Sequence, residues 1–172
     1  PANPALSGSA TVTSGLNASI VAHLTETGQP MLSVFVNDDS PILDDMSRLV
    51  VRHLAAAPAV DVALYDDDDL DEKDLVAKFE NLTNPNEQQG EVPEDDYYAT
   101  ISPAGTNTPV ADPLELELED ETSTIAYAVG SLADGTFTVL LQTIELEELD
   151  DDADDHHDDS IYKKIRPKGT AR

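Results

Sequence analysis

Residues 50–64 read VVRHLAAAPAVDVAL, two apolar runs that flank a short stretch of alanines and one proline. Valine and leucine favour strands, and the proline marks a turn between the two runs. Successive side chains of a strand point to opposite faces, so Arg52 and His53 cannot act together on one substrate. The stretch therefore predicts two strands joined by a turn. We expect Arg52 or His53 to serve the structure, by pairing with Asp61 or by hydrogen bonding to the loop at residues 55–58.

The same strand pattern recurs along the chain. Residues 114–119 read LELELE, which places leucines on one face of a strand and carboxylates on the other. Turn residues separate such segments, and sustained helical periodicity is nearly absent. The predicted fold is an all-β sandwich. Its other strands are expected near residues 9–13, 18–24, 31–37, 48–54, 59–65, 75–80, 87–92, 97–103, 123–129 and 136–146.

An internal echo indicates how the chain is divided. Residues 19–36 and 124–142 share the order strand, polar turn, strand, at a spacing of roughly 105 residues, which is one sandwich's length. The predicted organisation has three parts: residues 1–46, the C-terminal half of a first β-sandwich repeat or donated strands; residues 47–149, a complete sandwich with an acidic insertion at 66–74; and residues 150–172, an acidic and then basic flexible tail. The chain opens with Pro1, so we expect a removed leader or a larger parent.

Charge dominates the composition. The chain holds 36 acidic and 9 basic residues, a net charge of −27. Such a surface repels nucleic acid and anionic lipid, because binding them needs clustered lysine and arginine. Carboxylates about 4 Å apart repel by roughly 1 kcal/mol in water, whereas the Debye length falls to about 3 Å in 1 M salt. We therefore hypothesise a halophilic prokaryote, an archaeon, as the source. A surface that is acidic only for solubility is the alternative.

The acidic insertion supplies the candidate metal ligands. Carboxylate oxygens suit calcium, and three aspartates have the spacing of a calcium loop: Asp67, Asp69 and Asp71. Glu72 stands where that loop has its glycine, and Lys78 stands where it has a bidentate glutamate. A diffuse layer of counterions is therefore the alternative, and no cofactor other than calcium is expected.

Other features carry weaker signals. Asn17 and Asn81 begin glycosylation sequons, which also arise by chance. His23 lies in an apolar strand and is expected to pack there or lie at an edge. His156 and His157 stand among aspartates that could collect zinc or nickel weakly. Cysteine is absent, which excludes disulfides and thiolate chemistry, and no apolar run is long enough to predict a membrane span.

Five motifs follow one another along the chain: VVRHLAAAPAVDVAL (50–64), NLTNPNE (81–87), YYATISPAG (97–105), YAVGSL (127–132) and QTI (142–144). In this order they resemble a prokaryotic secreted β-sandwich family, the domain of unknown function 4397, over about residues 47–145. The insertion at 66–74 and the sequence VPEDDY at 92–97 depart from the family pattern. The resemblance implies an immunoglobulin-like or transthyretin-like antiparallel β-sandwich, often in tandem in secreted or surface proteins, and it implies no catalytic residues.

These observations predict a non-catalytic extracellular or cell-surface structural module. Its strands would be donated between copies to build a filament or coat, so its partners would be other copies of itself, in a homo-oligomer, or cell-surface proteins. The alternatives are a calcium-dependent adhesion module and, less favoured, a metal-dependent enzyme. The chain has no nucleophile elbow, phosphate loop or dinucleotide fingerprint. A sugar-binding module is disfavoured because the chain lacks tryptophan.

Overall fold

The computed structural model describes residues 6–9, 11 and 13–149. Within them the chain forms ten strands and one short 3-10 helix, so the all-β prediction is confirmed. Residues 9, 11 and 13 are not in a strand, which corrects the expectation for 9–13 at its described positions. The elements are β1 (Ala18–Leu24), β2 (Pro30–Val36), β3 (Met46–His53), β4 (Val60–Tyr65), η1 (Glu72–Asp74), β5 (Leu75–Leu82), β6 (Glu87–Pro93), β7 (Asp95–Pro103), β8 (Leu114–Leu118), β9 (Thr122–Val129) and β10 (Thr138–Glu145).

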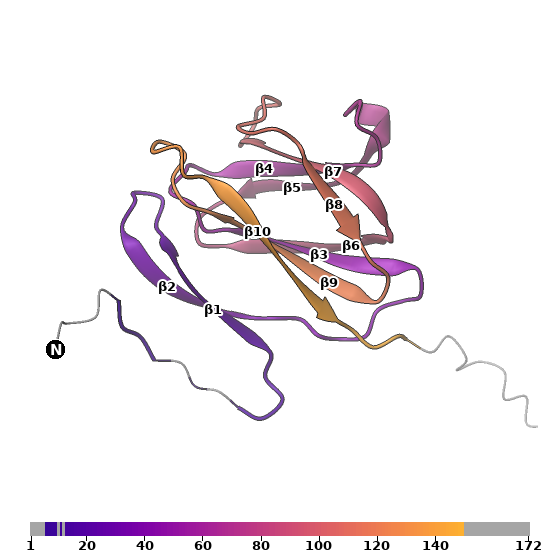
Figure 1. Cartoon of the computed structure of the whole chain (residues 1–172), viewed down its shortest axis with the longest axis horizontal. Helices are drawn as coiled ribbons and strands as arrows, with labels where there is room; N and C mark the ends of the chain where they lie inside the picture. The colour runs from indigo at the N-terminus through magenta and orange to yellow at the C-terminus, as the bar shows by residue number, and fades with distance from the viewer. Residues whose placement is uncertain (1–5, 10, 12, 150–172) are drawn as a thin grey trace, which may run out of the picture.

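Two four-stranded sheets pack as a sandwich (Figure 1). We call β10-β9-β3-β6 the first sheet and β5-β4-β7-β8 the second. Neighbouring strands are antiparallel except β3 and β9, which run parallel. With β3 to β10 lettered A to H, the sheets read HGAD and CBEF, whereas immunoglobulin constant domains have ABED and CFG. The strand order therefore differs from that of immunoglobulin constant domains.

The core lies between the inner faces of the two sheets. It is built mainly from aliphatic side chains at alternating strand positions, among them Leu49, Val51, Val62, Leu64 and Leu116. Leu49 and Val51 face this core, so Arg48, Val50 and Arg52 of the same strand face outward. The outer face of β3 is therefore apolar and cationic at once.

The β1–β2 hairpin forms a third layer on the outer face of the first sheet (Figure 1). Phe35 of β2 packs in a buried cluster with Val50 of β3, Leu54 after that strand, and Ile125 and Tyr127 of β9. The hairpin therefore buries one face against its own chain. Its likeness in form to the β9–β10 hairpin agrees with the echo, but its origin in a preceding repeat stays a prediction.

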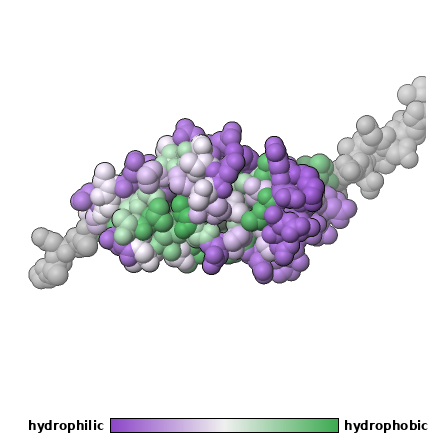
Figure 2. Space-filling model, turned by 90° about the horizontal axis from the view of Figure 1, so that it is seen from above, coloured by the Kyte–Doolittle hydropathy of each residue, from purple (hydrophilic) through white to green (hydrophobic). Residues whose placement is uncertain are grey.

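The acidic insertion lies between β4 and β5 and contains η1. Hydrophilic residues crowd the end of the molecule that holds this insertion, while hydrophobic residues gather toward the other end (Figure 2). Among the described residues no helix has the length and apolar character needed to cross a membrane.

Candidate functional site

The most extensively bonded side chain on the outer face of the first sheet is Arg52, which is 1% exposed. Its Nε donates to Glu87 Oε2 at 2.6 Å, its Nη1 donates to the Tyr127 hydroxyl at 2.9 Å, and its Nη2 donates to Asn37 Oδ1 at 2.9 Å. Its guanidinium carbon lies 4.5 Å from the ring centre of Phe35 and 5.2 Å from that of Tyr127. Arg52 therefore fastens β2 and the residue after it to the sheet.

Arg48 fastens the next part of the same segment. Its Nη1 donates to the backbone oxygens of Asp38 and Ser40, both at 3.1 Å, and its Nη2 donates to Glu91 Oε1 at 2.9 Å. Hydrogen bonds from the side chains of Ser40 and Gln89, with Arg48 nearby, lower the pKa of Asp38 to about 2. Asp38 is therefore ionised at neutral pH and lies 3.5 Å from Arg48.

Both acidic partners follow from the strand register. In the antiparallel pairing of β3 with β6, Arg48 lies opposite Glu91 and Arg52 lies opposite Glu87. Cross-strand pairs of opposite charge stabilise a sheet. Sequence reasoning named Arg52 but missed Arg48 and both glutamates; the signal was the matching spacing of two arginines and two glutamates on neighbouring strands.

His53 points the other way, so the prediction that Arg52 and His53 diverge is confirmed. Its Nε2 lies 2.9 Å from the Pro58 oxygen, which confirms the predicted hydrogen bond to the loop at residues 55–58. The Nδ1 atom is buried and has no hydrogen-bond partner. Burial lowers the pKa of His53 below its usual value, so the imidazole stays neutral and Nε2 is the donor.

The predicted pairing of Asp61 with Arg52 or His53 is wrong. The turn after His53 carries the chain from the first sheet to the second, and Asp61 faces outward from β4. Its carboxylate accepts the backbone N–H of Asn81 at 2.7 Å and that of Gly105 at 2.9 Å. These bonds, that of Asn81 foremost, lower the pKa of Asp61.

The acidic insertion brings together only part of the predicted metal site. Asp67 and Asp69 place carboxylate oxygens within 4.8 Å of each other and of Asp68, and all three residues are exposed. Asp71 lies outside this group and pairs with Lys73 at 3.8 Å. The backbone N–H of Asp69 lowers the pKa of Asp67, and a hydrogen bond with Asp67 raises that of Asp68. Calcium binding here stays a prediction.

A second carboxylate group was not visible in the sequence. Asp44 of the connector after β2 lies with Asp120 and Glu121 of the β8–β9 turn, their oxygens within 4.8 Å of one another. The Oδ1 atom of Asp120 is buried and unpartnered, although the residue as a whole is only partly buried. More than 70 positions separate Asp44 from the other two in the sequence, so only the fold could bring them together.

The remaining predicted residues lie apart from these groups. His23 is buried in the hairpin, with Nε2 2.8 Å from Ser33 Oγ, so its predicted packing is confirmed. Asn17 is half-buried and its side-chain oxygen accepts a bond from Asn37 at 2.8 Å, whereas Asn81 is exposed in β5. Glycosylation of both stays a prediction. His156 and His157 lie outside the described residues.

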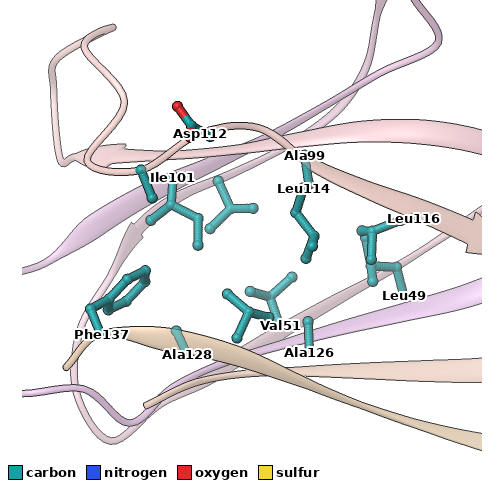
Figure 3. A pocket seen from close by; sticks show the side chains of 13 residues that line it. Leu49, Val51, Ala99, Ile101, Asp112, Leu114, Leu116, Ala126, Ala128 and Phe137 are labelled. Carbon is teal, nitrogen blue, oxygen red and sulfur yellow. The ribbon is translucent and has the colours of Figure 1, made fainter. Parts of the chain in front are cut away.

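A small apolar cavity of about 50 Å³ lies between the sheets (Figure 3). Side chains from both sheets point into it, among them Val51, Ile101, Leu114 and Phe137, and the Asp112 carboxylate points away. An engineered apolar cavity of about 150 Å³ binds benzene, so this space fits at most a few methylene groups. We read it as loose packing rather than as a ligand pocket.

A polar surface groove crosses the outer face of the second sheet. It runs between the acidic insertion and the loop after β7, and its lining includes Tyr65, Lys78, Thr100, Ser102 and Asn107. Tyr65, Lys78 and Asn107 offer hydroxyl, ammonium and amide groups there, whereas Thr100 and Ser102 are largely buried. The groove therefore offers polar groups to a partner on this face.

Comparisons with known proteins add little to this picture. No family model matches the chain, and no curated protein matches it. The resemblance to the domain of unknown function 4397 thus stays a prediction. A crystal structure described as a "putative cell adhesion protein" from Bacteroides ovatus is similar at 12% identity and a TM-score of 0.31, over 81% of this chain and 63% of that chain. The chain spans less than two thirds of that protein, and so slight a likeness carries no argument about function.

Proposed function

We propose that the chain is a non-catalytic structural module of a secreted or cell-surface protein, and that it associates with other copies of itself. The observation that carries this proposal is the fastening of the β1–β2 hairpin by Arg48 and Arg52. Six hydrogen bonds from these two side chains go to the connector after β2, to β6 and to β9. The two cations are thus committed to holding layers together.

Such fastening suits a tandem array. Residues 19–36 echo residues 124–142, which form most of the closing β9–β10 hairpin of the sandwich. If residues 1–46 close a preceding repeat, then the arginine contacts hold the end of that repeat against the outer face of the first sheet of the next repeat. A fixed angle between repeats is what a rod or coat needs.

The distribution of charge agrees with a surface protein in concentrated salt. Every cation among the described residues pairs with a carboxylate: Arg48, Arg52, Lys73 and Lys78. No basic patch is therefore available in this part of the chain for nucleic acid or anionic lipid. A halophilic source, and an extracellular place of action, belong to the proposal.

Strand donation remains one route to assembly. The hairpin already covers the Val50, Leu54, Ile125 and Tyr127 cluster of its own chain. Donation to a neighbour would exchange this contact for an identical one, at little net change in energy, as in domain swapping. In the structure the hairpin packs on its own chain, so we take the copies to be joined elsewhere.

Calcium-dependent adhesion is the second candidate. The acidic insertion, with Asp67 and Asp69, borders the polar groove on the second sheet, so a cation bound there would lie beside any partner in the groove. A D67N/D69N double variant separates the two candidates. Under the structural proposal it assembles as the native chain does, with calcium or with a chelator.

The absolute mass of the native chain in about 1 M NaCl tests the proposal by light scattering, with electron microscopy of the same sample. We expect a mass well above the 18.5 kDa of one chain and a regular assembly. A mass of one chain at every salt and protein concentration would overturn self-association. An assembly that appears only with calcium, and fails in the double variant, would replace the proposal with calcium-dependent adhesion.

A further inference from the structure

Each main sheet ends in two edge strands, and three of these four edges are protected against pairing with another chain. β6 carries Glu87 and Glu91 and ends in Pro93, and β8 has five residues with two glutamates. β5 carries Lys78 and Glu80, and its pairing with β4 has register shifts. Charges, proline, short length and bulges are the devices that keep edge strands apart.

β10 lacks these devices over its first seven residues. Residues 138–144 read TVLLQTI, a run without charge or proline, and they pair with β9 in unbroken register. Leu140 is 56% exposed and Leu141 is 50% exposed. Within the described part of the chain, β9 is its sole strand neighbour. In a molecule of net charge −27, this uncharged edge is the exception that needs a reason.

We propose that β10 pairs antiparallel with β10 of a second copy of this chain, about a two-fold axis, so that two first sheets become one continuous sheet. The inference rests on the proposed self-association and identifies the strand through which two copies make contact. A two-fold contact of this kind is self-complementary, which makes it the commonest way for identical chains to join.

The uncharged run of β10 favours a second copy of the same strand as its partner and determines how the two strands align. The uncharged run is centred on Leu141, so an axis through this residue places Thr138 opposite the partner's Ile144 and Val139 opposite the partner's Thr143. Every pair within the run is then uncharged. The two Glu145 carboxylates lie eight positions apart along the strands, roughly 27 Å, well beyond a Debye length of about 8 Å at physiological salt.

Side chains in the interior of the sandwich also indicate that β10 is the edge that pairs. Val139 lines the apolar cavity between the sheets together with Phe137 before β10 and Leu114 of β8. Leu141 lies two positions further along the same face of β10, yet half of it is exposed. A second strand beside β10 would extend the first sheet at this side and cover these apolar side chains.

A single cysteine tests the register, because the chain has no cysteine of its own. Residues directly opposite in an antiparallel pair have Cα atoms about 4.5–5.5 Å apart, within reach of a disulfide. We expect L141C in molar salt to oxidise to a covalent dimer at least tenfold faster than L140C. In the proposed register two L140C residues are offset by two positions, which puts their Cα atoms beyond about 7 Å.

V34C is the matched control, since Val34 is comparably exposed but lies in the hairpin. It should cross-link as slowly as L140C. Equal rates for all three variants would overturn the proposed pairing, whereas faster L140C would shift the axis and refute this register.

L141D gives an independent readout, since it places two carboxylates on the axis. We expect it to halve the mass in molar salt, with V34D unchanged and both variants folded by circular dichroism. A native chain that is monomeric would sink the proposed self-association itself. A native oligomer that survives L141D, with no selective cross-linking at L141C, would sink only the β10 joint.

Discussion

At the scale of single residues, Arg52 shows why this site requires arginine. The guanidinium is flat, so it lies against the rings of Phe35 and Tyr127, and it donates in three directions to Glu87, Tyr127 and Asn37. A lysine ammonium on a flexible stem cannot satisfy three fixed acceptors and stack on a ring. Replacing the guanidinium would lower stability because its buried partners would be left without a hydrogen bond.

R52K should therefore be destabilising despite its conserved charge. We expect the free energy of unfolding to fall by about 2–4 kcal/mol, since at least one charged hydrogen bond is lost and buried acceptors remain. Urea unfolding in molar salt measures the difference. K73R, on an exposed residue paired only at the surface, serves as control and should change stability by less than about 0.5 kcal/mol. An R52K effect as small as the control would contradict this account.

His53 should make the fold sensitive to mild acid. Its folded-state pKa is lowered by burial, so the unfolded chain takes up the proton first as the pH falls. The stability that neutral His53 contributes is present above about pH 6.5 and is lost as the pH falls from there toward the folded-state pKa. We expect H53Q, which keeps a donor for the Pro58 oxygen, to flatten the stability profile in that window.

Urea unfolding of H53Q and the native chain at pH 5, 6 and 7 provides the comparison. The lowered pKa values of Asp38 and Asp61 place the loss of their stability below this window. Parallel profiles for the two proteins would show that His53 is not the titrating group.

At the scale of elements, alternation predicted a sandwich and eleven strands. Ten of these strands are present, and the one expected at 9–13 is not at its described positions. Alternation failed where the answer depends on which sheet a strand joins. Asp61 lies eight positions after His53, but β3 and β4 belong to different sheets, so Asp61 cannot reach Arg52 or His53. The glutamates that do pair with Arg48 and Arg52 could be named only once the β3–β6 register was known.

The hairpin layer was also beyond prediction. Its strands were expected, but a hairpin can add to a sheet edge or cover a sheet face, and alternation is the same in both cases. The outward Val50 between two arginines was the clue, because an apolar residue on an outer face needs a cover. The candidate metal site failed in the opposite way. Sequence spacing placed Asp71 with Asp67 and Asp69, but the loop holds Asp71 apart from them.

F35A should loosen the hairpin as a unit. Truncating this buried ring removes packing against Val50 and Tyr127 and the stacking partner of Arg52, at an expected cost of about 3 kcal/mol. Limited proteolysis in molar salt should then cut the connector at residues 37–45 while the sandwich persists. V34A, on the exposed face of the same strand, should resist as the native chain does. Equal resistance of F35A would show that the hairpin is held by other contacts.

At the scale of the whole molecule, the two described arginines are buried, whereas most carboxylates lie on the surface. Because Arg48 and Arg52 are buried between the layers, Lys73 and Lys78 are the only lysine or arginine residues on the described surface. They are far outnumbered there by carboxylates. Repulsion among these carboxylates opposes folding and association alike. The same acidic surface therefore weakens the fold and the proposed β10 joint in dilute buffer, and salt should relieve both together.

Salt should accordingly raise the thermal midpoint and the mass in parallel. Between about 0.1 M and 1 M NaCl the Debye length falls from about 10 Å to about 3 Å, which removes repulsion between all but touching carboxylates. We expect the midpoint to rise by about 10 °C or more, with KCl equivalent and divalent ions unnecessary. Calorimetry and light scattering on one sample check both effects. A variant with Asp66, Asp67, Asp68 and Asp69 all changed to Asn should need less salt for the same midpoint, because fewer charges remain to be screened. If the native chain is equally stable in dilute buffer, then the acidic surface serves solubility alone.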